Sequence, residues 1–289
     1  MGLAHSNHGV LRVHRGDRAT VLAMLPKITS RRNPIVARFR EAARGADPDL
    51  LLLDGIHLVQ GALDAGLELR HVVVSADFAA HPEVRRIVEQ LRRRKADLAS
   101  ASAAVMEAVS PVRSASPIVA LAERPASAQT RMYAAEGPVL IAADVQDPGN
   151  LGAMVRVADA GGAAGLVAGG RSANPFAWKA LRGSMASALR LPIVIDRDLA
   201  SSLETARGHG RQIVATLPRG GTPYLDADLG GPIAILIGGE GDGLPPGAIE
   251  AADRRVTIPM TGGVESLNAA VAAAILVYEA RRQRTAKRA

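Results

Sequence analysis

The residues of this chain whose types suit chemistry gather near its C-terminal end. The segment from Ile258 to Asn268 (IPMTGGVESLN) runs directly into an alanine-rich stretch, residues 269–278. Ser266 stands where a helix N-cap belongs and Asn268 falls within the first turn, so both polar side chains crowd one helix N-terminus. Asn is a poor helix former and is costly to bury without partners. These two residues therefore either cap the helix and bond a neighbouring loop, or position a ligand.

A second group of candidates follows the apolar run of residues 139–144. Asn150 lies near the expected start of a helix, and Arg156 is assigned to the apolar face of that helix. A buried arginine needs an anion or a carboxylate beside it. Within the chain, Asp159 and Asp144 are the carboxylates that spacing favours as its partners.

A third segment combines another apolar run with glycines: residues 233–237 are followed by GGEGDGLPP up to Pro246. A dinucleotide-binding loop would need Gly-x-Gly-x-x-Gly opening a long helix, whereas Gly243 is soon followed by two prolines. The chain also has no P-loop, no Gly-x-Ser-x-Gly elbow and no metal-ligand spacing among its histidines. Common nucleotide, hydrolase and metal sites are therefore not expected.

The three segments, in this order, resemble the three motifs of the SpoU (TrmH) family, which are RNA ribose 2′-O-methyltransferases of the SPOUT superfamily. The matching patterns are Asn150-x-Gly152-x-x-x-Arg156, Gly238-x-Glu240-x-x-Gly243, and Ile258-Pro-Met with Ser266-Leu-Asn268. The resemblance is good for residues 138–282, moderate for residues 31–125 and absent before residue 31.

The resemblance implies a pocket for S-adenosylmethionine. Glycine loops let backbone groups approach an adenine and its ribose closely, and apolar residues sandwich the ring. The positions implied for this pocket are Gly238, Gly239, Ile258, Met260 and Leu267.

The resemblance also implies the catalytic residues. Arg156 would face the target nucleotide and stabilise the developing alkoxide, with a phosphate oxygen of the RNA taking the proton, because an arginine is too basic to act as a base itself. Asn150 would position the ribose or tie down its loop. Glu240 would orient Asn268 or Arg156, and Ser266 with Asn268 would complete the polar wall opposite the methyl donor.

Two larger features follow from the same resemblance. Family members thread the C-terminal segment, here residues 257–279, through a loop to form a trefoil knot, although knots are otherwise almost absent from proteins. They are homodimers with the knotted regions at the interface.

Strand and helix patterns indicate two α/β units. In the first, Asn33 caps a helix that Pro34 opens and Gly45 ends. Further strands and helices alternate there, which indicates an α/β/α layered domain. They are expected at residues 50–53, 56–65, 69–75, 82–95, 103–109 and 118–122.

The second unit has strands near residues 139, 165, 193, 213, 233 and 255 and is expected to hold a mostly parallel sheet. The patterns divide the chain into a basic N-terminal extension (1–30), an α/β/α domain (31–124), a linker (125–137) and a second domain with a short basic tail (138–289). The resemblance implies that the first domain binds the RNA substrate and that the second is the SPOUT methyltransferase domain.

The net positive charge of the chain is concentrated near its N-terminus. Residues 1–45 hold nine Lys or Arg and two acids, so this segment carries as much net charge as the whole chain, +7. Such a segment suits a phosphate backbone or an anionic membrane surface; residues 1–25 are expected to form a disordered, solubilising tail. Arg31, Arg32 and Asn33 are the predicted RNA contacts, because they adjoin the first ordered helix.

The chain has no cysteine and only 2% aromatic residues. These features exclude disulfides, thiol nucleophiles and Cys-based metal sites, and they argue against base stacking on an aromatic platform. No signal peptide or long apolar span is evident, so a soluble cytoplasmic protein with no membrane partner is expected.

Large-subunit rRNA is the expected substrate, because the extra N-terminal unit favours it. A tRNA ribose methyltransferase and a catalytically silent RNA-binding or ribosome-assembly protein are the alternatives.

Overall fold

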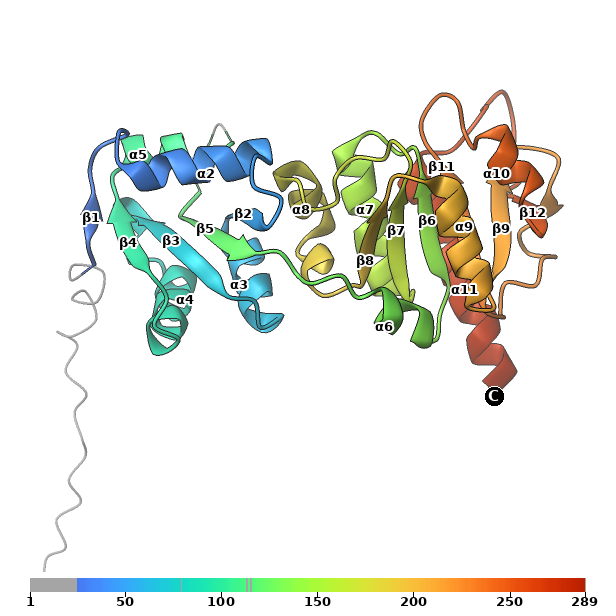
Figure 1. Ribbon diagram of the computed structural model, residues 1–289, viewed down its shortest axis with the longest axis horizontal. Coiled ribbons are helices and arrows are strands. Elements are labelled where there is room, and N and C mark those ends of the chain that lie inside the picture. Colours follow the sequence, from blue (N-terminus) through green and yellow to red (C-terminus); the bar gives the residue numbers. More distant parts are fainter. Residues whose placement is uncertain (1–24, 79, 113, 115, 289) are drawn as a thin grey trace, which may run out of the picture.

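A computed structural model describes residues 25–288, apart from residues 79, 113 and 115, and holds two β-sheets (Figure 1). The tail expected over residues 1–25 therefore lies almost wholly outside the described residues. Strand β1 (Lys27–Ile28) belongs to the first sheet, so ordered structure begins before residue 31.

The first sheet is mixed. Its five described strands follow the order β1-β4-β3-β5-β2. β5 runs antiparallel to both of its neighbours, and the other pairs are parallel. The strands beyond β1 are β2 (Leu50–Asp54), β3 (Leu69–Ser75), β4 (Leu98–Ala101) and β5 (Ile118–Glu123).

Helices cover both faces of this sheet, as expected of an α/β/α layer. Helices α2 and α5 pack on one face, and α3 and α4 on the other (Figure 1). Asn33 accepts the N–H of Ile35 at the start of α2, and Gly45 (φ +70°) ends it, which confirms both predicted caps. The elements are α2 (Pro34–Arg44), α3 (Ile56–Asp64), a short 3₁₀ turn η1 (Ala76–Phe78), α4 (Pro82–Arg93) and α5 (Ala103–Val109).

The expected linker holds a helix of its own, α6 (Gln129–Ala134). Its Tyr133 is buried and stacks on His209, with ring centroids 4.4 Å apart. Arg211 is also buried and donates to the carbonyls of Gly137 (2.5 Å) and Ala135 (2.8 Å). Burial lowers the pKa of Arg211, because it disfavours the charged form. The linker is thus fastened to the second sheet.

The second sheet has seven described strands in the order β10-β12-β9-β11-β6-β7-β8, and every neighbouring pair is parallel. All six strands predicted for this unit are present. The strands are β6 (Val139–Ala143), β7 (Gly165–Gly169), β8 (Ile193–Asp196), β9 (Gln212–Leu217), β10 (Thr222–Pro223), β11 (Ile233–Gly238) and β12 (Arg254–Thr257).

Two helical layers enclose this sheet. Helices α7, α8 and α11 lie on one face, and α6, α9 and α10 on the other. The basic residues 281–288, expected as a short tail, are the last turns of α11. The bounds are α7 (Pro148–Gly161), α8 (Trp178–Ser184), the 3₁₀ turn η2 (Ser187–Leu189), α9 (Leu199–Gly208), α10 (Pro246–Glu250) and α11 (Ala269–Arg288).

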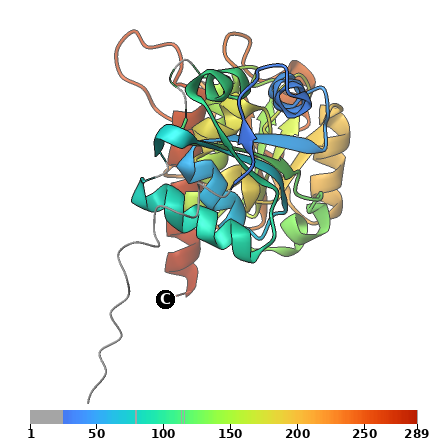
Figure 2. The same ribbon diagram turned by 90° about the vertical axis from the view of Figure 1, so that its left-hand side faces the viewer.

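A parallel sheet gathers its strand ends at one edge, and such edges hold ligands in open α/β folds. The loops that follow β11 and β12 stand together at this edge, at the top of Figure 1. In Figure 2 the loop before α11 again lies at one end of the molecule, and the C-terminal end of α11 lies at the other.

Candidate active site

A cleft of about 480 Å³ lies at the carboxyl ends of β9, β11 and β12. The segments that line it belong to residues 216–218, 237–249 and 258–272. The five positions predicted for a cofactor all contribute to its wall: Gly238, Gly239, Ile258, Met260 and Leu267. The loops that the sequence patterns singled out therefore do converge on one cavity.

Backbone packing explains why glycines stand at the end of β11. A Cβ on Gly239 would lie 2.0 Å from the carbonyl oxygen of Asp144, and one on Gly238 would lie 2.4 Å from the carbonyl carbon of Gly243. Such distances leave no room for a side chain. The loop is closed by a bridge between Gly239 and Gly243, so its backbone lies directly against the end of β6.

A polar chain of three side chains stands at the cleft. Nδ2 of Asn150 donates to the carboxylate of Glu240, and Nδ2 of Asn268 donates to Oδ1 of Asn150 over 2.9 Å. Glu240 and Asn268 both line the cleft. The structure thus brings together one residue from each of the three sequence segments.

The partner of Glu240 differs from the expectation. It was predicted to orient Asn268 or Arg156, but its carboxylate accepts from Asn150. The reason is placement: Asn150 lies in the first turn of α7, between the loop after β11 and the start of α11. Glu240 therefore acts on Asn268 only through Asn150.

The cap of α11 is also reassigned. Ser266 was expected at the N-cap and Asn268 inside the helix, but α11 begins at Ala269. Oδ1 of Asn268 accepts from the N–H groups of Ala270 (3.0 Å) and Val271 (3.3 Å), which makes Asn268 the cap. Ser266 is exposed and lines the cleft.

Arg156 does not lie where the sequence analysis placed it. It is exposed on α7 and contributes to neither the cleft nor a neighbouring pocket. Neither predicted carboxylate serves it, because Asp159 pairs with Arg190 (2.5 Å) and Asp144 with Arg171 (3.4 Å). Its position follows from helix geometry: at about 100° per residue, Arg156 points away from Met154.

The predicted RNA contacts at the start of α2 have roles within the fold. Arg31 bonds the carbonyl of Ala104 (2.8 Å) and the carboxylate of Glu107 (2.7 Å), while Asn33 caps the helix. Arg32 has an exposed side chain. Of the three residues, Arg32 is the one left open by these contacts.

The sequence analysis missed the wall supplied by β9. Thr216 and Leu217 line the cleft, and Oγ1 of Thr216 is buried without a hydrogen-bond partner among the described residues. Strand adjacency could have found them, since the carboxyl ends of neighbouring parallel strands meet at the same edge.

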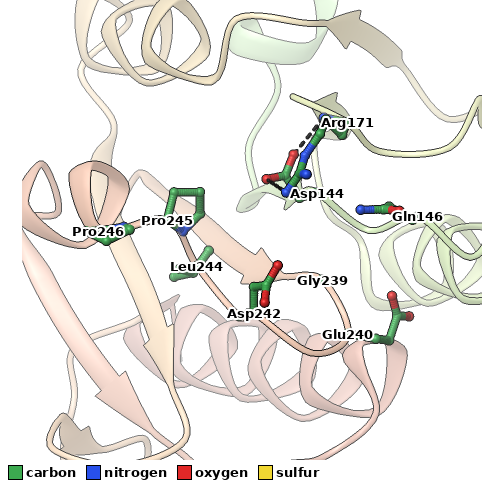
Figure 3. Close-up of a pocket in the computed structure, with 10 residues that line it drawn as sticks. Asp144, Gln146, Arg171, Gly239, Glu240, Asp242, Leu244, Pro245 and Pro246 are labelled. Carbon is green, nitrogen blue, oxygen red and sulfur yellow. Dashed lines mark hydrogen bonds and ion pairs between the residues drawn. The ribbon is translucent and has the colours of Figure 1, made fainter.

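A second pocket, of about 280 Å³, adjoins the cleft (Figure 3). Asp144 stands at its rim with φ +60°, and its carboxylate accepts from the backbone N–H of Arg171 (2.6 Å) as well as pairing with that guanidinium. Glu240 and Asp242 line both cavities. The two spaces are thus neighbours across one loop.

Neither a metal site nor a membrane span is found in the part of the chain that the structure describes. No group of three or more His, Asp or Glu residues there could hold a metal ion. None of its helices is long and apolar enough to cross a membrane.

Comparison with known proteins gives one family. The model of the SpoU rRNA methylase family matches residues 137–278. The chain is 33% identical over 230 residues to the 23S rRNA (guanosine(2553)-2′-O)-methyltransferase RlmP of Bacillus subtilis, an alignment that covers 80% of this chain and 88% of the relative. It is 34% identical to a 23S rRNA (guanosine-2′-O-)-methyltransferase RlmB from Burkholderia, over 82% of this chain and 98% of that one.

Solved structures agree with this result. The AdoMet-bound rRNA methyltransferase of Sinorhizobium meliloti superimposes with a TM-score of 0.78 at 30% identity, over 89% of this chain and 97% of that one. The SpoU methyltransferase AviRb of Streptomyces viridochromogenes, in complex with AdoMet, gives 0.77 at 28% identity, over 88% and 100%.

Proposed function

This chain belongs to the SpoU rRNA methylase family, and on that premise we propose that the cleft and the Asn150 group form its active site for methylating a ribose of large-subunit rRNA. The protein is an S-adenosylmethionine-dependent RNA 2′-O-ribose methyltransferase. The observation that carries the site assignment is the bonded chain Glu240–Asn150–Asn268 beside the glycine-walled cleft.

The chemistry of the cleft lining supports its assignment to the cofactor. Ile258, Met260 and Leu267 supply apolar surface for an adenine, and the glycines leave backbone groups open to it. The unpaired hydroxyl of Thr216 adds a polar atom on the same wall, and a buried polar atom without a partner marks a place where a ligand group is expected. When bound, S-adenosylmethionine supplies a methyl group on a positively charged sulfur.

The hydrogen bonds that Asn150 already makes support a role in holding the target ribose. Its carboxamide oxygen accepts from Asn268 and one N–H is donated to Glu240, so the amide cannot rotate. One N–H and one lone pair remain for a ligand. In the proposed site these groups hold the target ribose with its 2′-oxygen toward the methyl donor, and Ser266 with Asn268 completes the polar wall.

Arg156 is proposed to act across a dimer interface. It is exposed and unpaired among the described residues of its own chain, so its guanidinium is available to a second subunit. There it would stabilise charge developing on the 2′-oxygen, while a phosphate oxygen of the RNA takes the proton. With S-adenosylmethionine bound, the methyl group would pass to the 2′-oxygen, and the sulfur would keep the electron pair of the broken carbon–sulfur bond.

Exposed apolar residues on α11 support a homodimer. Val271 and Tyr278 are each 48% exposed and lie seven residues apart, on one face of the helix. Nearby Val264 is 50% exposed. A C-terminal trefoil knot is proposed in the same region, supported by the insertion of the late strand β12 between β9 and β10. An rRNA substrate also favours a cytoplasmic location.

The test is methyl transfer from labelled S-adenosylmethionine to separate pools of rRNA and tRNA lacking the modification, followed by mapping of 2′-O-methyl stops. One stop in large-subunit rRNA is expected. Label in tRNA alone would overturn the rRNA assignment. Cofactor binding by calorimetry without transfer to either pool would contradict an active enzyme.

A further inference from the structure

The small pocket of Figure 3 lies where the base of the target nucleotide is expected. It shares the loop after β11 with the cofactor cleft, and Glu240 lines both spaces. The base of a nucleotide is bonded to the carbon next to the one carrying the 2′-hydroxyl. If the ribose sits against Asn150 and Glu240, as proposed above, its own base must lie directly beside Glu240. The small pocket meets that condition.

Its lining is suited to a flat ligand with hydrogen-bond donors. Leu244, Pro245 and Pro246 supply an apolar side, and most of the polar side chains lie across from it (Figure 3). The polar residues are Asp144, Gln146, Arg171, Glu240 and Asp242. Carboxylates outnumber cations here, so the pocket disfavours a phosphate and favours groups that donate.

Two of these side chains are free to read a ligand. Asp144 is bonded to Arg171, and Glu240 to Asn150. Gln146 and Asp242 make no side-chain hydrogen bond or ion pair with any residue that the structure describes. The carboxylate of Asp242 and the carboxamide of Gln146 are therefore available to bond a ligand.

The backbone holds Asp242 at the pocket. It stands between Gly241 (φ +98°) and Gly243 (φ +68°), two conformations that favour glycine. The bridge between Gly239 and Gly243 closes this loop at its base. The loop therefore presents Asp242 from a fixed stem.

We propose that this pocket receives a guanine base, which makes Asp242 and Gln146 specificity-determining residues of the methyl transfer. Guanine carries two adjacent donors, N1–H and the exocyclic amino group, which pair with the two oxygens of one carboxylate. Its O6 accepts from the carboxamide of Gln146. Adenine places an acceptor nitrogen opposite Asp242, so two acceptors would face one another and no hydrogen bond would form there. Uracil offers a single ring donor.

The inference rests on the proposed function and deepens it. A site built to bond a substrate group rejects analogues that lack it, because its own polar atoms are then left unpaired. The base should therefore be chosen by the polar side chains of the small pocket and not by the apolar side chains of the cofactor cleft. Gln146 lines only the small pocket, whereas Asp242 lines both, so variants of the two residues separate these roles.

The experiment uses a short RNA containing the mapped target, with guanosine, inosine or adenosine at that position. The full-length enzyme should methylate them in that order, with guanosine at least tenfold ahead of adenosine in kcat/KM. Asp242→Asn should lower kcat/KM on guanosine at least tenfold and on inosine less, since inosine lacks the exocyclic amino group. Gln146→Ala should lower it on guanosine and inosine alike. Cofactor affinity by calorimetry should stay within twofold in Gln146→Ala, because Gln146 lines only the small pocket.

Asp226→Asn is the matched control, because Asp226 is exposed and lines neither cavity. It should behave like the unmodified enzyme. Equal wild-type rates on all three RNAs, or an equal loss on all three in Asp242→Asn, would overturn the proposal. Weaker cofactor binding by Gln146→Ala would also overturn it, by placing that carboxamide in the cofactor site. If the wild type modified no RNA at all, the proposed function itself would fail instead.

Discussion

Asn268 donates from Nδ2 to Oδ1 of Asn150 over 2.9 Å, across a separation of 118 residues in the chain. The oxygen of the same side chain caps α11 through the N–H groups of Ala270 and Val271. One side chain thus starts the last helix and fixes the amide that faces the ribose in the proposed site. Asn268 therefore combines two roles, capping α11 and positioning the amide of Asn150. Substitutions at this residue can separate the two.

Replacing Asn268 by Asp should retain the cap and remove the positioning bond. Asp caps about as well as Asn, so the free energy of unfolding should change by less than about 0.5 kcal/mol. Methyl transfer should fall at least tenfold, since a carboxylate would oppose the carbonyl of Asn150 and Glu240 prevents that amide from turning. Asn268→Ala should also lose about 1 kcal/mol of stability. Urea unfolding and turnover measure the two effects, and normal turnover in Asn268→Asp would refute the positioning role.

Arg156→Lys should reduce turnover at least tenfold. A lysine keeps the positive charge but loses the planar fork that bonds two oxygens at once. Arg156→Ala and Asn150→Ala should abolish transfer and leave cofactor affinity within tenfold, because both residues act on the RNA in the proposed site. Calorimetry with S-adenosylmethionine checks the second point. Loss of cofactor binding in both variants would place them in the cofactor pocket.

Gly239→Ala should disrupt the cleft, whereas Gly247→Ala should not. A Cβ at residue 239 would meet the carbonyl oxygen of Asp144 at 2.0 Å, and one at residue 247 would meet nothing within 4 Å. We expect a loss of cofactor affinity of at least tenfold in the first variant and normal affinity in the second. Wild-type binding by Gly239→Ala would show that the loop can move away from β6 without consequence.

Arg211→Ala should destabilise the fold by about 2–3 kcal/mol, because hydrogen bonds from a charged group to buried carbonyls would be lost. The carbonyls concerned belong to Gly137 and Ala135, just after the end of α6. Arg219→Ala serves as the control, since Arg219 is exposed. Urea unfolding compares the two, and an unchanged midpoint in Arg211→Ala would show that α6 is held by packing alone.

Glu279 should make the free energy of unfolding depend on pH in the acidic range. Hydrogen bonds from Arg282 lower its pKa below the usual 4.5, and Gln283 adds a smaller contribution. A carboxyl whose pKa is lower in the folded state stabilises the fold above its unfolded pKa, and that stability is lost as the pH falls through the folded value. Glu279→Gln should therefore lose less stability than the wild type between pH 6 and pH 3. Equal losses would show that the pair with Arg282 contributes nothing.

Strong local patterns allowed the sequence to predict most of the helices and strands. The apolar runs that became β6 and β11 are long and bounded by glycine or proline, and the cap signals of α2 are local. Strand β4 was missed, since its sequence LASA has little β propensity and is held by pairing with β1 and β3. Helix α6 was missed for a similar reason: its buried Met132 and Tyr133 pack against residues of the second sheet that are distant in sequence.

The parts of the candidate site that could be predicted are those where a sequence motif stands at the end of a strand. The cleft proposed for the cofactor follows from glycine loops after β11 and β12, and the five positions predicted there line one cavity. The choice between Ser266 and Asn268 as the cap was not predictable, because both are good caps and the decision lies with Asn150. Helix periodicity already predicts that Arg156 is exposed, because it lies on the opposite side of the helix from Met154. The assignment of Arg156 to the apolar face did not take this into account.

The bond between Asn150 and Asn268 also couples the proposed site to the seat of α11. The amide pair closes only when the first turn of α11 lies against α7. A local opening that lifts this turn from α7 would break the bond and free the Asn150 amide to turn. The proposed site and the docking of α11 would therefore be lost together, before the rest of the fold opens.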